Sequence, residues 1–522
     1  MTFSVTEIYN HVDDKMRARR DVLYGLESGA LPGGPEKYLL DSPRGYWTRP
    51  DEDLTDPHSW HLFDTIKEMI SAAEHSVDVV TMDEPGGFLY SAVRVGLAAI
   101  AERAAPVKVR ILIGRSLPHG VIKPEVKLKE LADDLRRYAG RKLQIAFGEY
   151  RFQMASWGHA KFVAVDGKHL ITGGHNLWGY AYLHKEPVLD LSMRYEGPIA
   201  RGAHRFANGL WGFVKKHNTG MGSTHGFVMD EKLQMKRAVF DDFAIGSSPS
   251  TALAGAPPML WVTNPGWGIF LDGTKPYVDN SFVHAFVKAM EGGSWCRLSQ
   301  QDLAATWRAS DRDFSILDRT RQGLQDYPYD LLACQNCYFI RPLVDAMAAF
   351  LNRREDNWIE LVASPEKKAG RGYTNKIPPS ALFNIVGNRM WELSGRKLKK
   401  AEIFGKLSRQ LYFGIVSFSG GRQTWHTDKS PKYNHAKFWM VDDVFYVGSE
   451  NFYPSTAPLM PPGLLQEFGV VAQATAETKK AILERYFTPL RTHSVENKVD
   501  IRYLTWNEAG EDEESAAVAA GE

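Results

Sequence analysis

The sequence has little cysteine, no excess of charge of one sign and no long apolar run. Its 522 residues include three cysteines, which cannot build a disulfide framework and fit a reducing compartment. Lys and Arg number 63 against 62 Asp and Glu, a formal charge of +1. No global basic field therefore favours nonspecific binding to nucleic acid.

Membrane insertion and export also lack their usual signals. No stretch approaches the roughly 18 consecutive apolar residues that a membrane-spanning helix needs. The N-terminal residues contain neither an apolar segment nor a small-residue cleavage site of the kind found in secretory signals. We therefore expect a soluble protein, either cytoplasmic or exported without a recognisable signal peptide.

The composition is that of a globular protein, and one pattern occurs in it twice. Hydrophobic residues make up 44% of the chain and charged residues 24%, as in ordinary soluble domains. Residues 159–166 read HAKFVAVD, and residues 435–442 read HAKFWMVD. A motif repeated in two distant places indicates one site built from two halves.

The surroundings of the two motifs repeat as well. Apolar periodicity predicts a helix, a strand, a helix and a strand before each motif. The segments are 62–73, 77–82, 88–102 and 107–113 in the first half, and 281–290, 296–300, 342–353 and 358–363 in the second. This alternation predicts an α/β fold with a mostly parallel sheet, flanked by helices, in each of two duplicated lobes. We place the lobes at 1–250 and 251–505 and a disordered acidic tail at 506–522.

Within each motif, strand alternation brings the histidine and the lysine to the same side. This applies to His159 with Lys161 and to His435 with Lys437. A second apolar run follows each motif and ends in a tight turn that carries an asparagine, GGHN to Asn176 and GSEN to Asn451. We expect a hairpin that places each Asn beside the His and the Lys.

These residue types suit chemistry at a phosphodiester. Lysine and asparagine side chains donate to non-bridging oxygens, where negative charge grows as phosphorus becomes five-coordinate. One imidazole attacks phosphorus, and the other protonates the leaving alkoxide. The spacing lacks a zinc or magnesium ligand signature, so we expect no cofactor and no metal.

A carboxylate follows each motif at a comparable place. Asp190 and Glu467 each lie inside an apolar run, where burial without a partner is costly. We expect them to orient the two histidines and fix their tautomers, with Asp190 beside His159 and Glu467 across the pseudo-twofold axis. For Asp166 and Asp442, which end the motif strands, we expect a structural role.

The two motifs resemble the duplicated HKD motif of the phospholipase D superfamily, and in particular the secreted bacterial phospholipases D. The resemblance covers about residues 38 to 490 and includes both Asn-bearing turns and the SQQDL segment at 299–303. This chain departs from those enzymes in lacking a signal peptide and disulfides and in having a longer insert at 455–463.

The resemblance implies a fold and an activity. The fold is an αβαβα sandwich of two α/β lobes with the site at their junction. His159 is then the nucleophile that forms a covalent phosphohistidine, and His435 is the general acid and then the base. The implied reaction is hydrolysis of phosphatidylcholine-like glycerophospholipids at a membrane surface, or transfer of the phosphatidyl group to an alcohol instead of water.

We expect substrate contacts from residues near the two motifs: Trp157, Gly174, Trp178, Ser449, Phe452 and Tyr453. Two other functions remain open, a phosphodiesterase of the same superfamily that acts on nucleic acid and an inactive lipid-binding or scaffolding protein. The balanced charge argues against nucleic acid as a partner. The internal duplication removes the need for a dimer to complete the site, so we expect a monomer.

Overall fold

The structure is a computed structural model that describes most of the chain. The described residues are 3–16, 20–42, 61–82, 85–103, 106–114, 123–135, 143–152, 156–177, 188–217, 225–229, 234–236, 255–266, 280–306, 331–334, 337–364, 379–416, 434–452, 465–495, 498–499 and 501. The predicted acidic tail at 506–522 lies outside them.

The first lobe is built on a mixed sheet in which three neighbouring strands are parallel. These are β3 (Ser76–Met82), β4 (Val107–Gly114) and β5 (Leu143–Phe152). Antiparallel strands extend the sheet on both sides. Beyond β3 come β7 (Phe162–Val165), β8 (His169–Gly173), β9 (Asp190–Glu196) and β2 (Leu39–Ser42), and beyond β5 come β10 (His225–Met229) and β11 (Met235–Lys236).

The second lobe repeats this order. Its parallel strands are β13 (Trp295–Gln300), β17 (Trp358–Ala363) and β18 (Leu411–Ile415). The antiparallel strands beyond β13 are β19 (Lys437–Val441), β20 (Val444–Gly448), β21 (Leu465–Gln473), β12 (Pro258–Asn264) and β1 (Tyr24–Ser28). The expected α/β class is confirmed, but parallel pairing is confined to three strands of each sheet. The hairpins that carry the motifs supply the antiparallel part.

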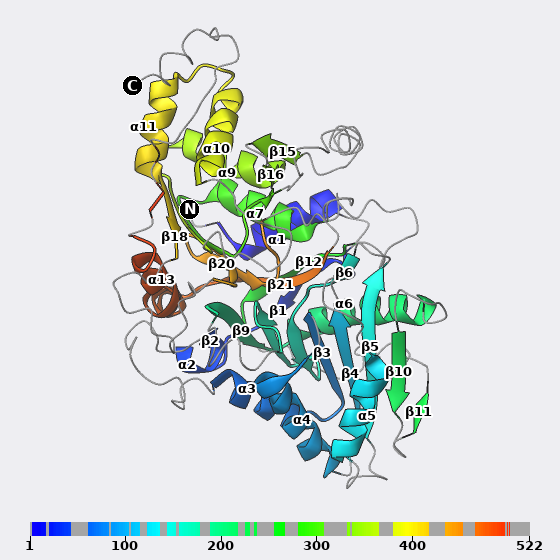
Figure 1. Ribbon diagram of the computed structural model, residues 1–522. Helices are drawn as coiled ribbons and strands as arrows, with labels where there is room; N and C mark the ends of the chain where they lie inside the picture. The colour runs from blue at the N-terminus through cyan, green and yellow to red at the C-terminus, as the bar shows by residue number, and fades with distance from the viewer. Residues whose placement is uncertain are drawn as a thin grey trace, which may run out of the picture.

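Helices and sheets alternate in layers (Figure 1). One outer core joins the first sheet to α3 (His61–Ser71), α4 (Gly87–Ala101) and α5 (Pro124–Leu135). The central core lies between the two sheets and contains α6 (Ala200–His217), α12 (Ala476–Ile482), the π-helical turn Leu483–Phe487 and α13 (Thr488–Thr492). The other outer core joins the second sheet to α1 (Val5–Met16), α7 (Ser281–Gly292), α9 (Arg341–Arg353), α10 (Pro379–Leu393) and α11 (Lys400–Gln410). Two smaller pieces remain, the helix α2 (Pro35–Tyr38) and a sheet of β14 (Ala305–Thr306), β15 (Leu331–Cys334) and β16 (Cys337–Ile340).

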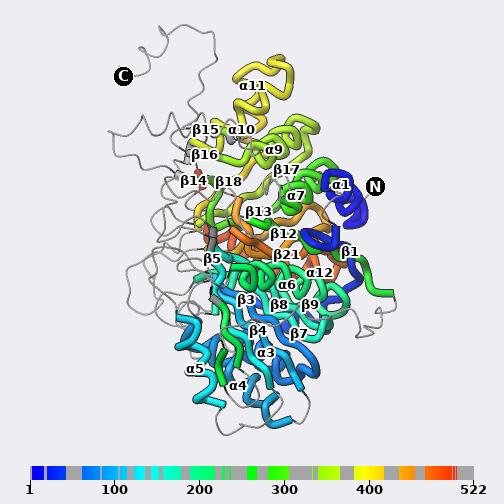
Figure 2. Tube along the Cα trace, turned by 90° about the vertical axis from the view of Figure 1, so that its right-hand side faces the viewer, coloured from blue at the N-terminus to red at the C-terminus, as the bar shows by residue number. Residues whose placement is uncertain are grey.

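The N-terminal segment packs on the second lobe. Strand β1 pairs with β12, and apolar residues of α1 belong to the core of the second sheet. Figure 2 shows α1 beside α7, far from the helices α3 and α4 of the first lobe. The lobes are therefore not simple consecutive halves of the chain, since residues 5–28 precede the first lobe in sequence and complete the second in space.

A short strand joins the two sheets at their junction. Strand β6 (Ser156–Gly158) pairs antiparallel with β5 of the first sheet and parallel with β21 of the second. Its last residue, Gly158, lies against Gly114, where an added Cβ would come 1.6 Å from the Gly158 carbonyl oxygen. Glycine at this position admits the close backbone approach that brings β6 to the lobe boundary. Among the residues that the structure describes, no helix is both long and apolar enough to cross a bilayer.

A fully buried ionic cluster supports the turn at the end of the first motif. Asp78 accepts from Nε and Nη2 of Arg110 at 2.6 and 2.7 Å, and all of these side chains are 0% exposed. The Nδ1 of His204 donates to Asp78 at 2.6 Å, while its Nε2 accepts from the backbone N–H of Gly167 at 3.1 Å. Burial alone would raise the pKa of Asp78, but Arg110 and His204 overcome that effect and lower it.

We predict that Asp78→Ala destabilises the protein by about 3–5 kcal/mol, because it leaves a guanidinium buried without its counterion. Urea unfolding followed by circular dichroism measures the loss. The double variant Asp78→Leu/Arg110→Met removes both charges and should recover most of it. A double variant as unstable as Asp78→Ala would show that packing, and not the unpaired charge, causes the loss.

Candidate active site

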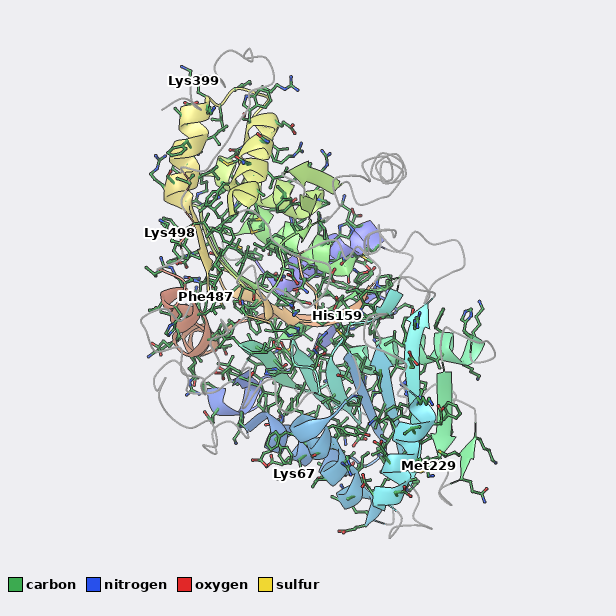
Figure 3. The ribbon with its side chains drawn as sticks, viewed as in Figure 1. Lys67, His159, Met229, Lys399, Phe487 and Lys498 are labelled. Atoms are coloured by element: carbon green, nitrogen blue, oxygen red, sulfur yellow. The ribbon has the colours of Figure 1, made fainter. Side chains whose placement is uncertain are left out.

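Both motif histidines lie at the junction of the lobes, just before the strand that follows each motif. His159 and Lys161 precede β7, and His435 precedes β19, which begins at Lys437. All four side chains are buried, with 0 to 6% of each residue exposed. Figure 3 labels His159 at the middle of the molecule, between the two lobes. The structure thus brings together the two motifs that the sequence predicts to form one site.

The backbone around each motif is held by a strand of the other lobe. The N–H of His159 donates to the carbonyl of Gln466 at 2.9 Å, and β6 pairs with β21 beside it. The N–H of His435 donates to the carbonyl of Leu189 at 2.7 Å, and Leu189 bridges Asn434. In each lobe, therefore, the N–H of the motif histidine donates to a backbone carbonyl of the other lobe.

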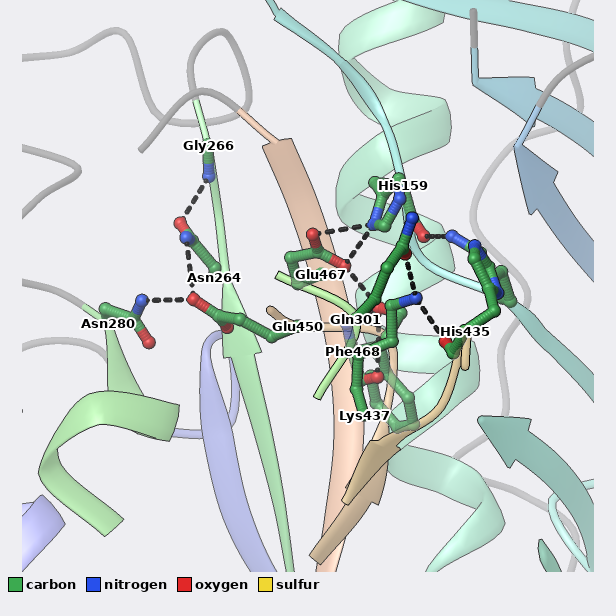
Figure 4. A network of polar contacts seen from close by, with 12 residues as sticks. His159, Asn264, Gly266, Asn280, Gln301, His435, Lys437, Glu450, Glu467 and Phe468 are labelled. Atoms are coloured by element: carbon green, nitrogen blue, oxygen red, sulfur yellow. Dashed lines mark hydrogen bonds and ion pairs between the residues drawn. The ribbon is translucent and has the colours of Figure 1, made fainter. Parts of the chain in front are cut away.

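The orienting acids are exchanged between the lobes in the same way. Nδ1 of His159 lies 2.7 and 2.9 Å from the carboxylate oxygens of Glu467 (Figure 4). Nδ1 of His435 lies 2.7 Å from Oδ2 of Asp190. The expected pairing of Asp190 with the neighbouring His159 is wrong. Asp190 and Glu467 lie next to Leu189 and Gln466, whose carbonyls cross the junction, so each carboxylate faces the histidine of the opposite lobe.

Each lysine is anchored by the carbonyl of its own histidine. Nζ of Lys161 donates to the carbonyl of His159 at 2.5 Å, and Nζ of Lys437 donates to the carbonyl of His435. Lys437 also donates to Oε1 of Gln301 at 2.7 Å. We did not single out Gln301 as a site residue from the sequence. The available signal was its place directly after β13, whose last residue, Gln300, pairs with Lys437.

Burial and the two lysines shape the charge of the histidines. Burial, reinforced by Lys437 and Lys161, lowers the pKa of His435 to about 3. The same causes hold the pKa of His159 well below its ordinary value. Burial also lowers the pKa of Lys437 to about 8, although nearby carboxylates oppose this. An anion bound between the lysines would offset the effect of their charge on both imidazoles.

The two acids are electrostatically different. Burial alone would raise the pKa of Asp190, but His175, His435 and Lys437 lower it well below its ordinary value. Burial raises the pKa of Glu467 to about 8, although Lys161, Ser449 and Lys437 act against the rise. The acid that faces His435 therefore has a lowered pKa, and the acid that faces His159 has a raised one.

The two tight turns lie directly against these acids. At Gly174 an added Cβ would come 1.9 Å from Oδ1 of Asp190, so only glycine leaves room for the carboxylate. At the equivalent place of the second turn, the hydroxyl of Ser449 donates to Glu467 at 2.5 Å. We expected substrate contacts from Gly174 and Ser449, and the structure places both against the orienting acids.

The asparagines of the turns are buried. Asn176 is 0% exposed and Asn451 is 4% exposed. Asn176 lines one cavity together with Lys161, whereas no contact places Asn451 beside Lys437. The cavity beside the first motif has polar and apolar walls, which include Lys161, Asn176, Ser192, Leu62, Ile66 and Leu89.

The third residue of each turn, His175 or Glu450, differs between the two halves and has different neighbours. His175 contacts the hydroxyls of Ser192 and Ser42, both at 2.8 Å. Glu450 accepts on Oε1 from the side-chain amides of Asn264 at 3.1 Å and Asn280 at 2.6 Å, as Figure 4 shows. Burial, together with the charge of Glu467, raises the pKa of Glu450 well above its ordinary value.

The motif aspartates cap the far ends of the motif strands. Asp166 accepts from the backbone N–H groups of residues 74, 75 and 76 at 2.7 to 2.9 Å. Asp442 accepts from those of Ser294 and Trp295 at 3.0 and 2.9 Å. Both residues have positive φ, 54° and 52°, a conformation that aspartate tolerates better than most residues. These contacts lock the motif hairpins to the loops before β3 and β13.

The aromatic residues named as substrate contacts have different positions. Trp157 lies half-buried in β6 at the junction. The ring of Phe452 is buried and packs edge-on against Phe282 and Phe286 in the core of the second sheet, and its contact with substrate stays a prediction. Trp178, Tyr453 and the whole 455–463 insert lie outside the described residues. Within the described part of the chain, no three His, Cys, Asp or Glu side chains converge as metal ligands would.

Glu450→Gln tests the protonation of this buried acid, because glutamine has the shape of a protonated glutamate. The folded-state pKa lies above the unfolded value, so the contribution of Glu450 to stability is full at low pH and is lost as the pH rises. We predict that Glu450→Gln matches the wild type near pH 4, below the unfolded pKa of glutamate, and melts at an increasingly higher temperature as the pH rises to 9, by roughly a few degrees or more. Thermal melts across this range provide the measurement.

Glu450→Ala is the matched control. It leaves the amides of Asn264 and Asn280 without their acceptor and should lose about 1–3 kcal/mol of stability at every pH. If Glu450→Gln lost as much stability at alkaline pH as the wild type does, Glu450 would not be the group that titrates.

Comparison with known proteins agrees with this geometry. No protein-family model matches the chain. A phospholipase D of Streptomyces antibioticus is 26% identical over 511 residues, covering 90% of this chain and 85% of that protein. Among solved structures, a phosphatidylserine synthase of Haemophilus influenzae matches with a TM-score of 0.48 and 11% identity over 98% of this chain and 96% of that one. A polyphosphate kinase of Porphyromonas gingivalis matches with a TM-score of 0.39 and 10% identity over 85% of this chain and 49% of that one.

The sequence similarity runs through both lobes, and the resemblance drawn from the two motifs is confirmed. The chain is similar to a phospholipase D over most of its length and is an enzyme of the phosphodiesterase and phosphatidyltransferase type.

Proposed function

We propose that the protein is a phospholipase D that cleaves the distal phosphodiester bond of phosphatidylcholine-like glycerophospholipids. The products are phosphatidic acid and the free headgroup, or a phosphatidyl alcohol when an alcohol replaces water. The observation that carries the proposal is the pair of buried histidines, each held at Nδ1 by an acid of the other lobe. This arrangement leaves both Nε2 atoms for reaction and fixes their tautomers.

The phosphate is bound by the cations and amides around the histidines. Lys161 and Lys437 supply positive charge in a buried site, where an anion gains more from it than in water. Asn176 lies in the same cavity as Lys161 and provides a neutral donor. These groups offset the charge that develops on the non-bridging oxygens as phosphorus becomes five-coordinate.

The reaction proceeds by two displacements. Nε2 of His159 attacks phosphorus, the bond from phosphorus to the headgroup oxygen breaks, and His435 transfers a proton to that oxygen. Water or an alcohol then gives its proton to His435 and attacks phosphorus, which breaks the bond to His159. Each step balances, because the proton leaves His435 in the first displacement and returns to it in the second.

The difference between the two acids supports this division of roles. Ionised Asp190 stabilises a protonated His435, as a general acid requires. Burial raises the pKa of Glu467, so this acid stabilises an imidazolium at His159 less than Asp190 does at His435, which favours the neutral imidazole that attacks. The bound phosphodiester anion raises the low pKa of His435 by offsetting the charge of Lys437 and Lys161.

One observation favours a lipid over a nucleic acid as the substrate. The chain has a formal charge of +1, which gives little attraction for a polyanion. The enzyme meets this lipid at a membrane surface as a peripheral protein.

Mass spectrometry of the products from a mixed phospholipid panel, with and without a primary alcohol, tests the activity. We expect phosphatidic acid from phosphatidylcholine and a phosphatidyl alcohol when the alcohol is present. His159→Ala and His435→Ala should each lower headgroup release by at least about 10⁴-fold, since members of a catalytic unit fail together. Cleavage of plasmid DNA with no lipid turnover would assign the site to nucleic acid instead, and full activity in either variant would refute the two-histidine mechanism.

The roles of the two histidines separate on a substrate whose leaving group needs no proton, p-nitrophenyl phosphocholine. We expect His435→Ala to release about one equivalent of nitrophenolate and then stall, because the attack survives while water lacks its base. His159→Ala should release none. Stopped-flow absorbance measures the burst, and a burst from His159→Ala would identify His435 as the nucleophile.

A further inference from the structure

The second lobe ends in a helical hairpin that extends away from its sheet. Helices α10 and α11 form the outer end of this lobe in both Figure 1 and Figure 2. Figure 3 labels Lys399 at the end of the hairpin, and His159 lies at the lobe junction. We call the exposed cationic and large apolar residues at its end the hairpin tip: Leu393, Arg396, Lys397, Lys399, Lys400 and Phe404.

The tip concentrates positive charge in a chain that is otherwise balanced. Four cations fall between positions 396 and 400 with no acid among them, in a protein whose formal charge is +1. Two exposed acids flank these cations: Glu402 accepts from the backbone N–H of Lys399 at 2.6 Å, and Glu392 pairs with Arg389, so the four cations still outnumber the acids around them. The tip is a local basic surface at a place remote from the active site.

Two large apolar side chains accompany the cations. Leu393 at the end of α10 is 45% exposed and Phe404 in the second turn of α11 is 38% exposed. The buried face of α11 is formed by other residues, among them Ile403 and Leu407. A cationic surface that serves solubility alone has no use for exposed Leu and Phe, whereas a surface that enters the boundary of a bilayer needs both kinds of side chain.

The backbone of the tip is held in an unfavourable conformation that displays an arginine. Gly395 and Arg396 both have positive φ, 67° and 63°, and for a residue with a Cβ atom this costs roughly 1–2 kcal/mol. The N–H of Arg396 donates to the carbonyl of Trp391 at 2.9 Å, and its guanidinium lies 5.0 Å from the Trp391 ring centroid. The hydroxyl of Ser394 accepts from the N–H groups of Lys397 and Leu398 at 3.3 Å.

We propose that the hairpin tip binds the surface of anionic phospholipid bilayers and tethers the enzyme to its substrate. Its cations complement the negative surface, with each contributing about fivefold to binding, while Leu393 and Phe404 enter the boundary between headgroups and acyl chains. Binding of the tip to a bilayer does not depend on the proposed function; only the benefit of that binding, access to a lipid substrate, rests on it. If the enzyme releases anionic phosphatidic acid, its own product strengthens the binding, and turnover on zwitterionic vesicles accelerates with time.

Cosedimentation with phosphatidylcholine vesicles, with and without phosphatidylglycerol, tests the tether on the full chain. We expect wild-type binding to rise with phosphatidylglycerol and to fall with salt. Arg396→Glu/Lys397→Glu/Lys399→Glu should lower binding to the anionic vesicles by more than about 100-fold, given about fivefold per cation. The matched control Lys108→Glu/Lys123→Glu/Lys129→Glu makes the same charge change on exposed lysines of the first lobe and should bind like the wild type apart from a small loss.

A milder variant keeps the test decisive if the triple variant folds poorly. Arg396→Gly removes one cation and relieves the positive φ, so it should melt at or above the wild-type temperature while binding anionic vesicles about fivefold less. Turnover of a monomeric short-chain phosphatidylcholine should be the same in wild type and tip variants. If that turnover is unchanged, a loss of vesicle binding is an effect on the membrane-binding surface. Vesicle binding gives this answer even if the wild type turns over no lipid.

Two results would overturn the proposal. Equal loss of vesicle binding in the tip and control variants would show that net charge, and not the tip, governs binding. Unchanged vesicle binding in the tip variants, together with lost binding to a DNA duplex, would assign the tip to nucleic acid.

Discussion

The reciprocal contact between the lobes is the interaction on which the site depends. Each histidine receives a carbonyl acceptor for its N–H and a carboxylate for its Nδ1 from the opposite lobe. Neither lobe alone contains a histidine with its orienting acid. Separating the lobes would break both contacts between a histidine and a carboxylate and both backbone hydrogen bonds at the junction. The catalytic arrangement and the cohesion of the two lobes therefore have the same physical cause.

The sequence predicted the parts of this arrangement that local pattern determines. Apolar periodicity located the helix, strand, helix and strand before each motif, and the repeated His, Lys and Asn indicated a single site. The exchange of Asp190 and Glu467 could not be read in this way, because sequence separation places each acid closer to the wrong histidine. Only the meeting of β6 with β21 and of Leu189 with Asn434 determines the pairing, and those contacts join residues hundreds of positions apart.

Phe452 and Ser449 show a second limit of sequence reasoning. Both adjoin the asparagine of the second turn, and proximity to a catalytic residue suggested contact with substrate. In the structure the Phe452 ring points into the core against Phe286, and the Ser449 hydroxyl is committed to Glu467. A tight turn sends successive side chains in different directions, so neighbours in sequence need not share a cavity. Conversely, Gln301 is distant from Lys437 in sequence, yet its side chain accepts a hydrogen bond from Lys437.

Symmetry of the backbone and asymmetry of the side chains have different roles in this site. The duplicated fold supplies two equivalent histidines, yet the proposed displacement uses one neutral and one protonated imidazole. The tight turns differ at one position, where His175 lowers the pKa of Asp190, while Glu450 is buried with a raised pKa and bound by Asn264 and Asn280. Duplication therefore creates the geometry of the site, and substitutions at the variable position of each turn differentiate the two halves without disturbing the backbone that holds them.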